Sequence, residues 1–107
     1  MREKFTLIIH FQEGFLDDTV ILMLNSKEVY RKEHLTTSLL RGPTASFFTD
    51  IEKGVVHVMV SIPSKDLSDS TTFTIRSNKY LGISIVDPQY YGCNIRFIVS
   101  TEPFGYM

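Results

Sequence analysis

The sequence predicts an all-β fold, a single antiparallel β-sandwich of about eight or nine short strands, with a β-barrel as the second choice. Short runs of alternating apolar and polar residues recur about every 8–12 residues between turn-forming residues. No segment shows the apolar period of an amphipathic helix. In general architecture alone, this spacing resembles that of immunoglobulin-like and jelly-roll sandwiches.

The clearest expected strand covers residues 55–62, between Gly54 and Pro63. Its β-branched residues suit a pleated, core-facing surface, and a period of two puts four of them on one face. These four residues are Val56, Val58, Val60 and Ile62. The sequence therefore predicts that this strand lies in the centre of the fold.

The first half of the chain predicts further strands over residues 4–12, 19–24 and 28–32. In the first of them, the residues expected to face the core are Phe5, Leu7, Ile9 and Phe11. Residues 19–24 are apolar on both faces, and Asn25-Ser26 forms a two-residue turn, since Asn tolerates positive φ. Glu33-His34 is a corner or a kink before the next alternating set, which consists of Leu35, Thr37 and Leu39.

The second half predicts strands over residues 46–51, 71–77, 81–85 and 95–99, in addition to the central one. Glu52-Lys53-Gly54 is expected to form a tight hairpin turn into the central strand. Residues 63–70 are rich in Ser and Asp and predict a polar loop, with Leu67 as its apolar anchor.

Composition is that of an ordinary globular protein, with 43% hydrophobic residues and a net charge of −1 over 107 residues. This length suits one domain, which we expect to cover residues 1–107. Charges of both signs are interspersed, and a nucleic-acid binder normally shows a basic stripe, so no nucleic-acid partner is expected. No apolar run approaches the ~20 residues of a membrane-spanning helix, so no membrane partner is expected either.

Cys93 is the only cysteine, which excludes an internal disulfide. The first residues also lack the apolar stretch and cleavage site of a signal peptide. Together these features predict a reducing compartment and a cytoplasmic protein.

No catalytic motif is present, since the chain lacks both a Gly-x-Ser-x-Gly elbow and a Gly-rich phosphate loop. His10, His34 and His57 lie on separate elements. His10 and His57 would need neighbouring strands to share a metal ion, with Asp50 or Glu52 as a further ligand, and the close ligand pairs typical of zinc sites are missing. We therefore expect no enzyme activity, no cofactor and no metal; a small metal-dependent β-barrel enzyme is the less favoured alternative.

Aromatic residues outside the expected strands are the candidate binding residues: Tyr90 and Tyr91 in one loop, Phe15 in the first loop, and Phe104 and Tyr106 in the tail. Tyrosine offers a large, rigid contact area with a polar tip and is enriched at interfaces. The alternative is that each of these rings folds back over an open end of the sandwich.

The function predicted from these features is a non-catalytic protein–protein interaction or self-association module. Outward apolar residues on several strands favour association, and we assign Ile8, Ile21, Met23 and Met59 to one such face. The alternative is a carbohydrate-binding sandwich in which the loop tyrosines stack on sugar rings, although the chain has no tryptophan.

Overall fold

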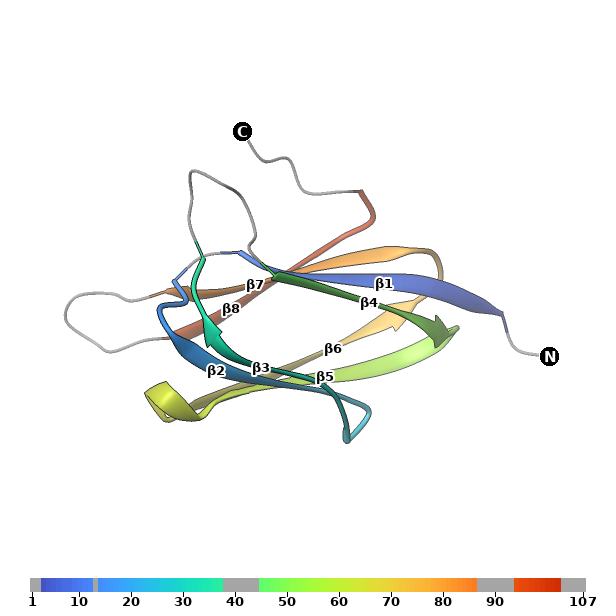
Figure 1. The fold of residues 1–107 in the computed structure, drawn as a ribbon. Coiled ribbons are helices and arrows are strands. Elements are labelled where there is room, and N and C mark those ends of the chain that lie inside the picture. The colour runs from blue at the N-terminus through green and yellow to red at the C-terminus, as the bar shows by residue number, and fades with distance from the viewer. Residues whose placement is uncertain (1–2, 13, 38–44, 87–93, 103–107) are drawn as a thin grey trace.

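The computed structural model describes residues 3–12, 14–37, 45–86 and 94–102, which form two packed four-stranded sheets (Figure 1). Sheet A contains, in spatial order, β4 (Ala45–Glu52), β1 (Lys4–Phe11), β7 (Lys79–Val86) and β8 (Asn94–Ser100). Sheet B contains β3 (Lys27–Leu35), β2 (Asp18–Leu24), β5 (Gly54–Ile62) and β6 (Leu67–Ile75). One short 3-10 turn, η1 (Pro63–Lys65), follows β5. Because the strands divide between two sheets and do not close into one, the predicted sandwich is confirmed over the barrel.

The core lies between the two sheets and consists of alternate residues of their strands, as the sequence predicts. On β5 the buried residues are Val56, Val58, Val60 and Ile62, and on β1 they are Leu7, Ile9 and Phe11. Burying one such side chain stabilises the fold by about 1.5–3 kcal/mol, which fixes which face of each strand turns inward.

The hairpin between β2 and β3 turns at the predicted pair Asn25-Ser26. Both residues have positive φ, 49° and 69°, as a type I′ turn requires. The Asn25 side-chain oxygen also accepts a hydrogen bond of 2.9 Å from the backbone N–H of His57. The turn is thereby tied to β5, the next strand of sheet B.

One strand pair departs from the antiparallel prediction. β1 and β7 lie side by side and run parallel, with Ile8 opposite Tyr80 and His10 opposite Gly82. The other neighbouring strands in both sheets are antiparallel. A parallel neighbour requires a long connection, and here the chain passes through sheet B before it returns to β7.

The turn at residues 52–54 is not the predicted hairpin, because it carries the chain from β4 in sheet A to β5 in sheet B. Gly54 has a φ of 133°, which a residue with a side chain rarely adopts. The Lys53 N–H donates a 2.8 Å hydrogen bond to the Glu3 carbonyl and fixes the crossing point. Alternation places the same residues inward in either arrangement, so the pattern alone could not separate a hairpin from a crossing.

Part of the predicted loop at residues 63–70 is a strand. Asp66 has a φ of 53° and its N–H donates to the Pro63 carbonyl at 3.1 Å, so the chain reverses within η1 and β6 begins at Leu67. Residues 68–70 then pair with β5 up to Ser61. They are polar because β6 is an edge strand of sheet B, whose free side tolerates Ser and Asp.

Glu33-His34 proves to be a kink within β3 rather than a corner. His34 has a φ of 57°, and the pairing of β3 with β2 shifts register beside it. Leu35 ends this strand and is buried. The expected continuation through Leu39 falls on residues 38–44, which lie outside the described residues.

Candidate functional site

Phe15, predicted as a binding residue, belongs to the core instead. It is only 2% exposed, and its ring meets that of Phe11 edge to face at 5.6 Å. The loop is held in place by the Thr37 N–H, which donates to the Phe15 carbonyl at 3.0 Å. The alternative reading, an aromatic cap that folds over the sandwich, is therefore the correct one for this residue.

The other four predicted binding residues, Tyr90, Tyr91, Phe104 and Tyr106, lie outside the described residues. Their assignment stays a prediction.

An apolar row crosses the outer face of sheet A and is the strongest candidate binding surface among the described residues. In the register of the sheet, Ile8 on β1 is opposite both Phe48 on β4 and Tyr80 on β7. Residues opposite each other point to the same face, and Leu7 and Ile9 are buried, so these three side chains share the outer face. Ile98 on β8 stands opposite Gly82, one step along from Tyr80 on the same face. We call Phe48, Ile8, Tyr80 and Ile98 the outer row.

Exposure differs along the outer row. The Phe48 side chain is the most open, with 75% of the residue exposed, and Ile98 is 39% exposed. Ile8 and Tyr80 are half-buried between them. The Phe48 ring is therefore an exposed apolar surface at the edge strand, beside the half-buried Ile8.

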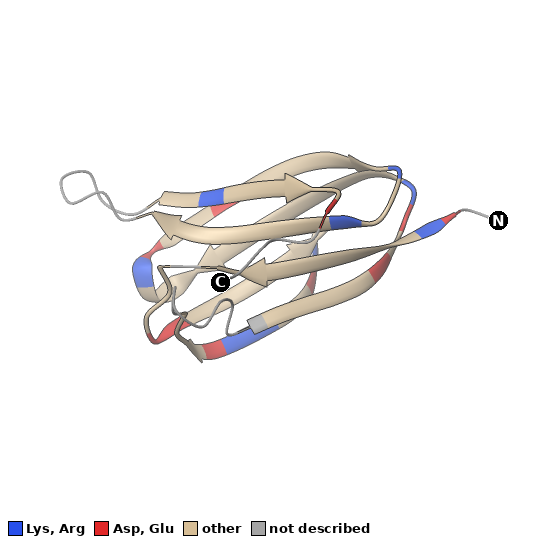
Figure 2. Cartoon of the chain, turned by 90° about the horizontal axis from the view of Figure 1, so that it is seen from above, with Lys and Arg blue, Asp and Glu red and all other residues tan. Residues whose placement is uncertain are grey.

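Charges lie around the outer row rather than within it. In the four strands of sheet A the charged residues are Lys4, Asp50, Glu52, Lys79 and Arg96, and most of them lie toward strand ends (Figure 2). His10 stands beside the row, opposite Ser46 and Gly82. Partial burial lowers the pKa of His10, so this imidazole is held toward its neutral form. The middle of the face is therefore suited to an apolar or neutral partner surface.

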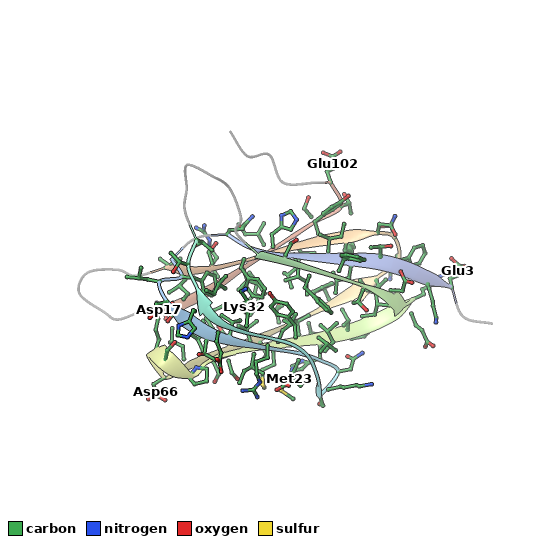
Figure 3. All side chains as sticks on the ribbon, viewed as in Figure 1. Glu3, Asp17, Met23, Lys32, Asp66 and Glu102 are labelled. Carbon is green, nitrogen blue, oxygen red and sulfur yellow. The ribbon has the colours of Figure 1, made fainter. Side chains whose placement is uncertain are left out.

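The outer face of sheet B is a separate surface with apolar residues of its own. Met23 and Met59 are opposite each other there, and Ile21 is opposite Ser61. Met23 points away from the space between the sheets (Figure 3). The four residues assigned from sequence to one face are thus divided, with Ile8 on sheet A and the other three on sheet B.

The three histidines lie in three different places. His34 Nδ1 is 2.6 Å from Asp17 Oδ1, and this hydrogen bond raises the pKa of His34. His57 Nδ1 is 3.0 Å from the Thr72 hydroxyl on the outer face of sheet B, whereas His10 is on sheet A. Within the described ranges, no group of three or more His, Cys, Asp or Glu side chains is arranged to hold a metal ion.

Asp18, the one ionised side chain of β2, is held in a network of hydrogen bonds and one ion pair. Asp18 is 2% exposed and accepts hydrogen bonds from the Leu16 N–H at 2.8 Å and the Ser64 hydroxyl at 2.7 Å, with Lys65 Nζ at 3.1 Å. Burial by itself would raise the pKa of Asp18, but these hydrogen bonds and the lysine charge outweigh it and leave the pKa below its usual value. The network joins the first loop to η1, and its satisfied groups indicate a structural role.

A polar depression of about 370 Å³ lies at the crossing between β4 and β5. Its lining consists of Asn25, Asp50, Ile51, Glu52, Lys53, Gly54 and Val55. The Asn25 side-chain oxygen already accepts a hydrogen bond from the His57 N–H. The depression therefore presents carboxylate side chains but no complete set of ligands for an ion.

Sequence reasoning missed Phe48, Tyr80 and Ile98 as surface residues. Two of them belong to apolar doublets, Phe47-Phe48 and Ile98-Val99, inside alternating strands. Since neighbours in a strand point to opposite faces, such a doublet must place one apolar side chain outside the core or at an edge. That signal was available in the sequence.

Among the described residues, no helix is long and apolar enough to cross a lipid bilayer. In comparisons with known proteins, no family model, no curated protein and no solved structure matches this chain.

Proposed function

We propose that the chain is a non-catalytic protein-interaction module that binds a protein through the outer face of sheet A. The observation that carries the proposal is the outer row, and above all the 75% exposure of Phe48 on an edge strand. Binding energy at protein interfaces concentrates in a few large side chains, with aromatic residues prominent among them. The half-buried Ile8 and Tyr80 extend that contact across the sheet.

The proposal includes no catalytic step, cofactor or metal. It is supported by the separate positions of the three histidines and by the structural use of Asp18. A cytoplasmic location is part of it, because the single cysteine suits a reducing compartment. Because acids and bases are interspersed along the chain and no apolar run approaches the ~20 residues of a membrane-spanning helix, we include neither a nucleic-acid nor a membrane partner.

Carbohydrate binding is the alternative that sequence left open. It depends on Tyr90 and Tyr91, which lie outside the described residues. The immunoglobulin-like likeness also stays a prediction, at the level of two packed sheets.

The test removes the most exposed part of the outer row and compares it with an equal loss elsewhere. The row variant is Phe48→Ser, at a residue that is 75% exposed, and the control is Val55→Ser, at a residue that is 68% exposed away from the row. Both variants should keep their stability, since changes at exposed positions usually cost no more than about 0.5 kcal/mol.

Each protein is then subjected to chemical cross-linking in cell extract, and the cross-linked species are quantified by mass spectrometry. The row variant is expected to lose the cross-linked protein partners that the wild type and the control share. Equal cross-linking by all three proteins would show that the outer face of sheet A is not the binding surface.

A further inference from the structure

The β4 edge of sheet A is open to another strand. β4 pairs with β1 on one side, and in the described part of the chain no strand pairs with its other side. Natural edge strands are usually protected by charges, proline or bulges. β3 carries such charges along most of its length, whereas β4 carries only Asp50 and Glu52. The edge strands β6 and β8 are also poor in charge, and the 75% exposed Phe48 ring distinguishes β4 from them. The backbone groups of β4 on that side therefore form a template for one more strand.

We propose that β4 pairs antiparallel with β4 of a second copy of this chain, with the two-fold axis at Phe48. The inference goes beyond the proposed function, because the second copy pairs with the edge of β4 and contacts Phe48, while Ile8, Tyr80 and Ile98 remain on the open outer face of sheet A. The two sheets A would become one continuous eight-stranded sheet, and the outer rows of the two copies would meet at the axis. Tyr80 and Ile8 of both copies would then continue a single apolar band.

Symmetry restricts the register of such a pair. A two-fold axis perpendicular to the sheet places one residue opposite its own copy, and opposite residues share a face. Only a few residues of β4 can occupy the axis if most of the strand is to stay paired. Within residues 45–52, an axis at Phe48 or Thr49 pairs seven residues of β4, whereas an axis at Phe47 or Asp50 pairs five.

Charge and side-chain matching select Phe48 among these positions. With Asp50 on the axis, two carboxylates would face each other directly, and with Thr49 there, each Phe48 ring would face a carboxylate. With Phe48 on the axis, the rings pair with each other and Asp50 stands opposite Ser46 of the second copy. The two Asp50 carboxylates are then four residues apart along the strand, about 13 Å, which exceeds the Debye length of about 8 Å at physiological salt.

The inward-facing side chains of β4 already hold this strand in place for pairing with a second copy. The Phe47 ring points inward and lies 5.4 Å from the Tyr30 ring of β3, centre to centre. This packing across the sandwich holds the strand in its extended form before any partner arrives. Little ordering of the backbone is then needed on association, which lowers the entropic cost of binding.

The register is tested by cysteine cross-linking in the full chain, with Cys93→Ser as background. Directly opposite residues have Cβ atoms about 4.5–5.5 Å apart, close to the reach of a disulfide. Ser46→Cys and Asp50→Cys proteins should each fail to form disulfide dimers alone, but an equimolar mixture should form them under mild oxidation. Phe48→Cys should form dimers alone, and Ser70→Cys, exposed on β6, is the collision control.

Two cross-linking results would overturn the proposal. One is a Ser46→Cys and Asp50→Cys mixture that cross-links no faster than the control, and the other is a Phe48→Cys and Asp50→Cys mixture that cross-links faster than the Ser46→Cys and Asp50→Cys mixture. The second would place Thr49 on the axis. If the cross-links fail while the row variant still loses its partners in extract, the proposed function stands and this inference falls.

The affinity of the pair is tested by sedimentation of the wild type and two lysine variants. Phe48→Lys puts two ammonium groups across the axis and should raise the dimer dissociation constant at least about tenfold, a loss of ~1.4 kcal/mol. Val55→Lys, at an exposed position on sheet B, should leave it unchanged. A wild type that sediments as a monomer at the highest attainable concentration, or equal dissociation constants for both variants, would overturn the inference.

Discussion

Truncation of Phe15 separates a core aromatic from an interface aromatic. In the structure the Phe15 ring is 2% exposed and contacts Phe11, which in turn stacks on Tyr30 at 5.7 Å. Phe15→Ala therefore removes a whole ring from a packed column. Such changes cost about 3–5 kcal/mol, out of a total stability of roughly 5–15 kcal/mol.

The neighbouring residue provides a matched control, because Leu16 belongs to the same loop but is 71% exposed. Leu16→Ala should change the free energy of unfolding by no more than about 0.5 kcal/mol. Phe15→Leu keeps most of the buried volume and should lose far less stability than Phe15→Ala.

Urea unfolding followed by circular dichroism gives the free energies, and a thermal scan gives the melting temperatures. A loss of 3–5 kcal/mol corresponds to a drop of about 12–20 °C for a domain of this size. If Phe15→Ala costs less than about 1 kcal/mol while association is weakened, Phe15 is a surface contact and the packing described above is wrong.

Three further outcomes are expected. Ser26→Gly should stabilise the protein by about 0.5–1 kcal/mol in urea unfolding, because glycine adopts the positive φ of this turn without strain; a loss of stability would contradict the turn type. Asp18→Asn should lose about 1.5–3 kcal/mol at neutral pH through the weakened Lys65 contact. Since the folded pKa of Asp18 is lowered, wild-type stability from this group is present above about pH 3.9 and lost as pH falls through the folded pKa, so the two proteins should converge in acid. For His34 the raised pKa means that its stabilisation is present below about pH 6.5 and lost as pH rises through the folded pKa; Asp17→Asn should lower that pKa in an NMR titration, and an unchanged value would show that the contact is absent in solution.

The candidate site was only partly visible in the sequence. Ile8 was recognised as an outward apolar residue, because it breaks the alternation of its strand. Its neighbours Phe48 and Tyr80 could not be placed beside it, since β4, β1 and β7 are far apart in sequence. Ile8 was instead grouped with Ile21, Met23 and Met59, which face the opposite side of the molecule.

Phe15 shows the opposite error. Its place in a Gly- and Asp-containing loop indicated exposure, because loops usually run over the surface. The contact that buries it comes from Phe11 and from residues near Thr37, and a loop that closes the end of a core takes its burial from such distant partners.

Alternation by itself determined the fold class and which face of β1 and β5 turns inward, since a period of two is a local property of an extended chain and burial selects the apolar face. The Asn25-Ser26 turn was equally local, because its positive φ values depend on the residues themselves. Strand order, in contrast, is not a local property. Whether residues 52–54 make a hairpin or cross between sheets, and whether β7 runs parallel to β1, depends on hydrogen bonds between segments distant in sequence. Only the tertiary structure decided these, and with them which outward residues lie side by side on sheet A.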